Sequence, residues 1–123
     1  MSLFAATLAE LAAGFQLPSL AFNPNGVAAL HLGETDLLTI EQVEDGVLLS
    51  LARPLPPHSM GLAEKALRVC GPEGGLPMPV RPGLTKDGRL VLTVRFSERE
   101  FTLQDTLRCL SLLRDAHTRI AAL

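Results

Sequence analysis

Three histidines and one serine are the first residues of this sequence to test for chemistry. His31, His58 and His117 are far apart, and none has the spacing of a zinc-binding HExxH or mixed His/Cys motif. Ser59 directly follows His58, but a nucleophile and its base need converging side chains and an orienting acid, which adjacency alone does not supply. We therefore expect neither a catalytic triad nor a metal site, and His117 is expected to pack or face solvent on a helix.

The cysteines and two short acidic segments also indicate structural roles. Cys70 and Cys109 each fall inside an expected helix without a CxxC pair, and such cysteines are more often small buried apolar residues than reactive thiols. Glu73–Gly75 lacks the GK[ST] ending of a phosphate-binding loop, and Glu98–Glu100 has the polarity of a solvated turn. We expect no enzyme and no cofactor. A small hydrolase or thiol enzyme that uses Cys70 or His58 is the alternative from a different class.

The composition indicates a single domain, residues 1–123, with an aliphatic core. Apolar residues make up 47% of the 123 residues but aromatic residues only 4%, with neither Trp nor Tyr. The mean hydropathy of +0.27 is high for so small a domain, so some apolar side chains are expected at an interface. A net charge of −2 argues against nucleic-acid binding, because no basic cluster is present to replace phosphate counterions.

The N-terminal sequence predicts a cytoplasmic protein. The segment MSLFAATLAELAAGF has no basic residue before its apolar part and carries Glu10 within it, unlike a signal peptide. No apolar run is long enough to cross a bilayer. Two cysteines without a CxxC pair fit a reducing compartment.

The longest periodic segment, Thr102–Leu123, predicts a helix that packs on the rest of the domain along one side. Its apolar stripe is formed by residues at three- and four-residue steps: Leu103, Leu107, Leu110, Leu113, Ala116 and Ile120. Thr102 is a good N-cap, and Asp105 supplies the acidic half of a capping-box-like pair. The segment before it, Arg89–Phe96, alternates and predicts a strand whose buried face carries Leu90, Leu92, Val94 and Phe96.

The preceding segments predict two more helices and an antiparallel sheet. The helices are expected at Leu3–Ala13 and Met60–Cys70, a short extended piece at Leu17–Phe22, and strands at Val27–Leu32, Leu37–Val43 and Val47–Ala52, the last of them central. Hairpin turns are expected at Glu44–Gly46 and Lys86–Gly88, and prolines confine any strand at Met78–Val80 to an edge or a bulge. The resulting fold class is α+β, an antiparallel sheet flanked by helices in the order α-β-β-β-α-β-β-α.

This order of elements and four stretches of sequence resemble a known family. The stretches are Leu48–His58 (LLSLARPLPPH), Ala63–Leu67 (AEKAL), Gly75–Gly83 (GLPMPVRPG) and Arg89–Leu103 (RLVLTVRFSEREFTL). Over nearly the whole chain they resemble the class I chaperones of type III secretion systems, which have the CesT/SycE-like fold, and in particular the SycN-type subunit.

The resemblance implies a chaperone that holds the N-terminal region of a secreted, YopN-like gatekeeper or effector in extended form and keeps it competent for export. An extended cargo segment can add main-chain hydrogen bonds at a sheet edge and place apolar side chains in grooves. The implied cargo-binding residues, each with the core as its alternative place, are Phe4, Leu8, Leu11, Phe15, Val27, Ala29 and Leu38. A regulatory adaptor of the same fold, which sequesters a regulator of secretion-gene expression, is the alternative function.

The resemblance also implies a dimer, either a heterodimer with a second, YscB-like chaperone or a homodimer. The implied contacts are Leu62, Ala66, Leu67 and Val69. Pro77, Pro79 and Pro82 weaken the strand expected at this interface, which argues against a symmetric homodimer joined by strand pairing and leaves loop or helix contacts. The expected location is the bacterial cytoplasm, peripheral to the secretion apparatus, with no nucleic acid and no stable membrane insertion.

Overall fold

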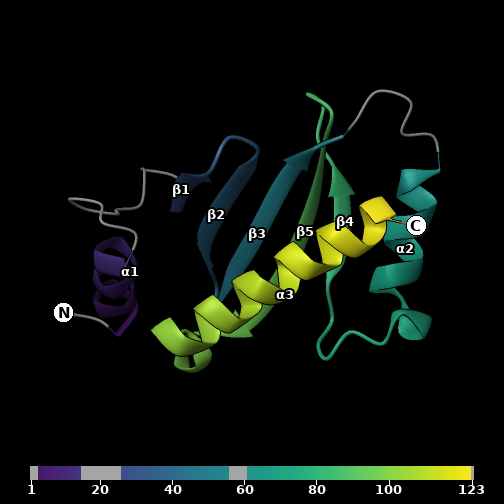
Figure 1. The fold of residues 1–123 in the computed structure, drawn as a ribbon. Helices are drawn as coiled ribbons and strands as arrows, with labels where there is room; N and C mark the ends of the chain where they lie inside the picture. Colours follow the sequence, from purple (N-terminus) through teal and green to yellow (C-terminus); the bar gives the residue numbers. More distant parts are fainter. Residues whose placement is uncertain (1–2, 15–25, 56–60, 123) are drawn as a thin grey trace.

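A five-stranded antiparallel sheet is the frame of the protein (Figure 1). The computed structural model describes residues 3–14, 26–55 and 61–122. The strands are β1 (Val27–Leu32), β2 (Asp36–Val43), β3 (Gly46–Pro54), β4 (Arg81–Leu84) and β5 (Arg89–Ser97). Their spatial order is β1-β2-β3-β5-β4, and every neighbouring pair is antiparallel.

The described residues also form three helices, α1 (Leu3–Gly14), α2 (Leu62–Cys70) and α3 (Leu103–Ala122), with short 3-10 turns η1 (Pro72–Gly74) and η2 (Glu98–Glu100). Figure 1 shows α3 running diagonally across one face of the sheet, with α2 beside the β4 edge and α1 near the beginning of α3. The α+β class and the predicted order of helices and strands are confirmed. The extended piece predicted at Leu17–Phe22 lies outside the described residues.

The predicted central position of β3 is confirmed, because β3 pairs with β2 on one side and with β5 on the other. Its residues 47–52 are apolar at almost every position. Leu51 pairs with Leu38 of β2 and with Leu92 of β5, and all three side chains are buried. These three leucines therefore form a row across β2, β3 and β5 in the middle of the core.

Both predicted hairpin turns are present. Asp45 has a φ of 57° between β2 and β3, and Gly88 has a φ of 84° between β4 and β5. Asp-Gly sequences tolerate these positive φ values, which tight hairpins require. The turns set the register, so the four apolar residues predicted on one face of β5 are all buried.

Helix α3 covers the core side of β3 and β5. Its buried residues follow the helical period: Thr106, Cys109, Leu110, Leu113, Ala116, His117 and Ile120. The predicted N-cap is formed, since the backbone N–H of Asp105 donates to Thr102 Oγ1 at 3.1 Å. The Asp105 carboxylate lies 3.7 Å from Arg108 Nη1, and the reciprocal capping box is made by Ser97 and Glu100 at η2.

The prediction is wrong for one residue of the apolar stripe of α3. Leu107 was expected on the buried side of α3, but its side chain is 43% exposed. The buried stripe passes through Thr106, one turn before Leu110, because the Thr106 hydroxyl donates to the Thr102 carbonyl at 2.6 Å and so enters the core without an unsatisfied polar group.

The edge strand is displaced from its predicted position. It spans Arg81–Leu84 instead of Met78–Val80. The Val80 side chain is buried in the core, and the chain pairs with β5 only after it. Pro82 is tolerated because β4 is an edge strand with a partner on one side.

Candidate interaction surfaces

Two leucines face solvent where α2 lies beside β4. The Leu67 side chain is 64% exposed and the Leu84 side chain is 59% exposed. Together they border an apolar cavity of about 180 Å³, which we call the α2–β4 patch; it is lined by Ala63, Ala66, Leu67, Pro82, Gly83, Leu84 and Leu90. Single exposed leucines are common on protein surfaces, but two around one apolar cavity are typical of an interface.

The four predicted dimer contacts divide between this surface and the core. Leu67 lies on the α2–β4 patch, and Leu62 is half-buried and packs against the core. Ala66 and Val69 are buried within the chain itself, because three residues on a helix bring side chains to the same face. Leu84, the second leucine of the patch, was not predicted, since the pattern placed the edge strand before it.

The predicted cargo residues of α1 form part of the core where the structure describes them. Leu8 and Leu11 are buried in the same cluster as Leu38 of β2. The Thr7 hydroxyl donates to the Phe101 carbonyl at 2.9 Å, which ties α1 to the segment that enters α3. The Phe4 side chain and all of Phe15 lie outside the described residues.

Strand β1 ends the sheet and carries the accessible part of the predicted cargo set. Ala29 is exposed and Val27 is half-buried, both on the sheet face opposite α3, whereas Ala28 between them points into the core. β1 pairs with β2 along one side, from Val27 opposite Glu41 to Leu32 opposite Asp36. Its outer side therefore offers an edge of the kind that extended peptides add to.

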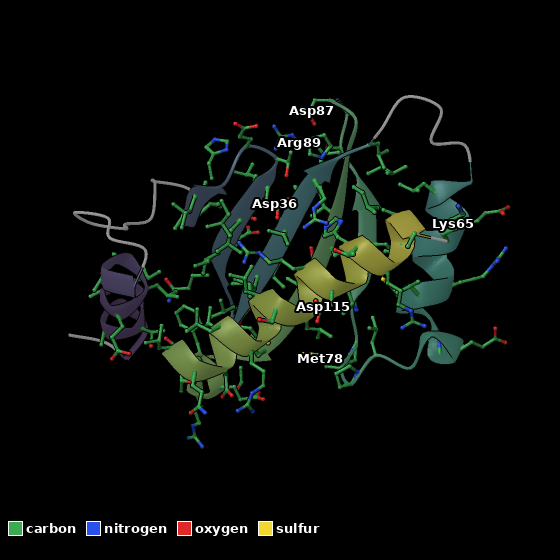
Figure 2. All side chains as sticks on the ribbon, in the orientation of Figure 1. Asp36, Lys65, Met78, Asp87, Arg89 and Asp115 are labelled. Atoms are coloured by element: carbon green, nitrogen blue, oxygen red, sulfur yellow. The ribbon has the colours of Figure 1, made fainter. Side chains whose placement is uncertain are left out.

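A charged pair lies at the margin of the core under α3. Arg53 donates two hydrogen bonds to Asp36, Nε to Oδ1 at 2.8 Å and Nη2 to Oδ2 at 3.1 Å. Asp36 is 6% exposed, and Figure 2 shows it on β2. The hydrogen bonds from Arg53 hold the pKa of Asp36 below its usual value, although burial opposes them.

His117 of α3 lies close to this pair. It is 3% exposed, and its Nε2 lies 2.8 Å from the Leu51 carbonyl oxygen, so this nitrogen must carry the proton and donate it. Burial lowers the pKa of His117, which keeps the imidazole neutral near pH 7. Of the two roles expected for His117, packing or contact with solvent, the structure shows packing.

Neither of the two cysteine thiols, Cys70 and Cys109, is activated as a nucleophile. Burial raises the pKa of both Cys70 and Cys109, so the thiolate form is disfavoured. The Cys109 Sγ of α3 lies 3.7 Å from Met78 Sδ. His58 lies outside the described residues. Within residues 3–14, 26–55 and 61–122 we find no cluster of three or more side chains able to hold a metal ion, and no helix that is both long and apolar enough to span a membrane.

The fold has clear relatives among solved structures. A chain of the Yersinia pestis type III secretion chaperone SycH in complex with a stable fragment of YscM2 aligns with a TM-score of 0.68 and 17% identity, covering 94% of this chain and 98% of that one. A chain of the ExsC–ExsE complex aligns with a TM-score of 0.72 and 22% identity, covering 94% and 90%. A chain of the heterodimeric ExoU–SpcU complex from the type III secretion system of Pseudomonas aeruginosa aligns with a TM-score of 0.66 and 25% identity, covering 92% of this chain and 93% of that one.

The sequence itself matches one family. No curated protein sequence is similar enough to count as a relative. The model of the family described as type III secretory system chaperone SycN matches residues 5–121, nearly the whole chain. The chain belongs to the SycN family of type III secretory system chaperones.

Proposed function

We propose that this chaperone binds the N-terminal region of a secreted gatekeeper protein in extended form, as one half of a heterodimer with a second small chaperone. The proposed location is the bacterial cytoplasm, at the periphery of the export apparatus. Membership in the SycN family over residues 5–121 carries the chaperone function. The α2–β4 patch supports the second subunit, because it is an apolar surface that the chain does not cover with the residues that the structure describes.

The dimer is proposed to form through side chains of α2 and β4. Burying one leucine side chain fully contributes about 1.5–3 kcal/mol, and Leu67 and Leu84 both retain more than half of their exposure in the single chain. Pro82 has no backbone N–H, so β4 is a poor strand for pairing across the interface. Leu62, Ala66 and Val69 fix α2 on the core and thereby hold Leu67 in place for the partner.

The cargo is proposed to add as a strand to the outer edge of β1. Its backbone would pair with β1, and its apolar side chains would contact Val27 and Ala29 on the open sheet face. Phe4 and Phe15 are proposed as further cargo contacts at either end of α1. Leu8, Leu11 and Leu38 are buried, and we propose that they serve the cargo site by keeping α1 on the core.

The test is co-expression with a candidate partner chaperone and the N-terminal region of a candidate gatekeeper, followed by size-exclusion chromatography with light scattering. We expect a complex of two different small chaperone chains and one cargo chain. Leu67→Glu should weaken the chaperone dimer at least about tenfold, because it places a charge in an apolar interface. Leu107→Glu is the matched control, since Leu107 is also exposed but lies on α3, outside the patch.

Three outcomes would contradict the proposal. A monomer that ignores both candidates would refute the dimer, and a homodimer that binds cargo without the second chaperone would refute the heterodimer. Capture of a folded regulator in place of an unstructured export region would favour the regulatory adaptor. Protease sensitivity of the bound partner separates the last case, because an extended segment is cut readily outside its contacts and a folded regulator is not.

A further inference from the structure

The sheet face opposite α3, called here the open face, has a hollow of about 510 Å³ that is lined by both charged and apolar side chains. It lies where the beginning of β3, the end of β5 and the beginning of β4 come together. Arg81 and Arg95 contribute its positive charges, and Asp45 and Glu100 its negative charges. Neither the predicted dimer contacts nor the predicted cargo residues belong to this hollow.

Arg95 is held in place over the strand next to it. Its Nη2 donates to the Glu44 carbonyl at 3.0 Å in the β2–β3 turn. The guanidinium lies against Gly46, where an added Cβ would stand only 3.3 Å from Arg95 Nε. A guanidinium has five N–H donors, and this contact uses one of them. Arg95 is therefore oriented in advance and keeps donors for a ligand.

Arg81 brings a second guanidinium to the same place. Its register partner on β5 is Thr93, which precedes Arg95 by two residues, so Arg81 and Arg95 are diagonal neighbours on one face. The Arg81 side chain is exposed, and its guanidinium makes no hydrogen bond or ion pair with any residue that the structure describes. Two like charges in one hollow repel each other, and a bound anion between them would relieve that repulsion.

The acidic residues of the hollow restrict which anion fits. Glu100 accepts hydrogen bonds from the Ser97 backbone N–H at 3.2 Å and the Ser97 hydroxyl at 2.8 Å. Within the described part of the chain, neither Glu100 nor Asp45 forms an ion pair with either arginine. These two carboxylates disfavour a doubly charged ligand such as phosphate, whereas a single carboxylate can take the guanidinium donors.

We propose that Arg81 and Arg95 bind the carboxylate of a glutamate or aspartate side chain from an extended partner polypeptide. Leu48 and Pro79, in the walls of the same hollow, provide contact for an apolar residue next to that acidic one. The inference rests on the proposed function, because an extended cargo chain is the partner that brings such a side chain to the open face.

The direct test uses the peptide acetyl-Leu-Glu-Leu-Glu-Leu-amide, its glutamine counterpart and inorganic phosphate as probes. Each is titrated into ¹⁵N-labelled protein while the Nε–Hε resonances of the two arginines are followed. We expect both resonances to shift with the glutamate peptide and not with the other two probes. Arg81→Glu should weaken binding of the glutamate peptide about tenfold or more, and Arg95→Gln should weaken it as well. Arg114→Glu, which makes the same charge change at an exposed position of α3, should leave it unchanged.

Four results would overturn the inference. The first three are equal binding of the glutamine peptide, tighter binding of phosphate, and loss of the chaperone dimer in Arg81→Glu, which would assign the arginines to the interface between subunits. Thermal unfolding of each variant checks that it is folded. A cargo complex that forms normally while the glutamate peptide fails to bind would refute this inference and leave the proposed function intact.

Discussion

The ion pair between Asp36 and Arg53 is expected to stabilise the fold, and Arg53→Met measures by how much. Methionine keeps much of the length and apolar contact of the arginine side chain but removes both hydrogen bonds to the carboxylate. Asp36 would then keep a single side-chain bond within the described residues, from the Thr35 hydroxyl at 3.1 Å. A buried carboxylate would be left without a countercharge.

The size of the effect follows from the burial of the two partners. Removing one partner of a fully buried ion pair costs about 3–5 kcal/mol, whereas an exposed pair contributes about 0–1 kcal/mol. The Asp36 side chain is 8% exposed and that of Arg53 is 28% exposed, so this pair lies between the two limits. We expect a loss of about 2–3 kcal/mol at pH 7, or a fall in Tm of about 8–12 °C for a chain of 123 residues.

The assay is thermal and urea unfolding at pH 7, with the His117 ring protons followed by NMR as a second readout. The positive charge of Arg53 helps to lower the pKa of His117, and the negative charge of Asp36 raises it. Arg53→Met should therefore raise the pKa of His117 as well as destabilise the fold. Arg114→Met, at an exposed position of α3, is the control and should change neither.

Two results would refute this reasoning. If Arg53→Met were as stable as the parent protein, hydration of the Asp36 carboxylate would make up for the lost hydrogen bonds and countercharge of Arg53. A pKa of His117 that falls or stays constant would show that the charge of Arg53 does not lower the pKa of the imidazole. The double variant Asp36→Asn/Arg53→Met separates the ion pair from packing, because it should recover part of the loss if the unpaired charge is its cause.

Two further predictions concern pH and the end of α2. Burial lowers the pKa of His117 below the value of about 6.5 that it has in an unfolded chain, so the unfolded state binds the proton more readily. We therefore expect the free energy of unfolding to decrease as the pH falls below about 6.5. Urea unfolding between about pH 7 and pH 5 checks this prediction. His117→Gln, which can still donate to Leu51, should make the free energy of unfolding less dependent on pH. An unchanged pH dependence in this variant would contradict the prediction. Gly74→Ala should destabilise the protein by about 2–4 kcal/mol in the same assay, because its Cβ would lie 1.8 Å from the Val69 carbonyl oxygen. Gly83→Ala, where nothing lies within 4 Å of the added Cβ, is its control, and equal stabilities of the two variants would contradict the prediction.

Much of the fold could be predicted because its signals are local. The alternation of β5, the Asp-Gly turns and the long periodic segment of α3 are properties of residues close together in the chain. The edge strand was misplaced because its position depends on a distant contact. Val80 enters the core between other elements, and pairing begins only at Arg81.

The interaction surfaces were less predictable, because helical periodicity identifies an apolar stripe but not which margin of it a neighbour covers. On α2 the tertiary structure buries Ala66 and Val69 and leaves Leu67 exposed to solvent. On α3 it leaves Leu107 exposed. Leu84 becomes part of the α2–β4 patch only because β4 lies beside α2.

The sequence by itself determined the class of fold, the order of its elements, the turns and the lack of a catalytic motif, since each depends on spacing along the chain. Only the tertiary structure decided which apolar side chains face solvent and which charged side chains lie close together. Arg53 reaches Asp36 across 17 residues, and Arg81 joins Arg95 through the pairing of β4 with β5. The physical reason is that burial and electrostatic pairing depend on distances in space, which the sheet order and the crossing of α3 set.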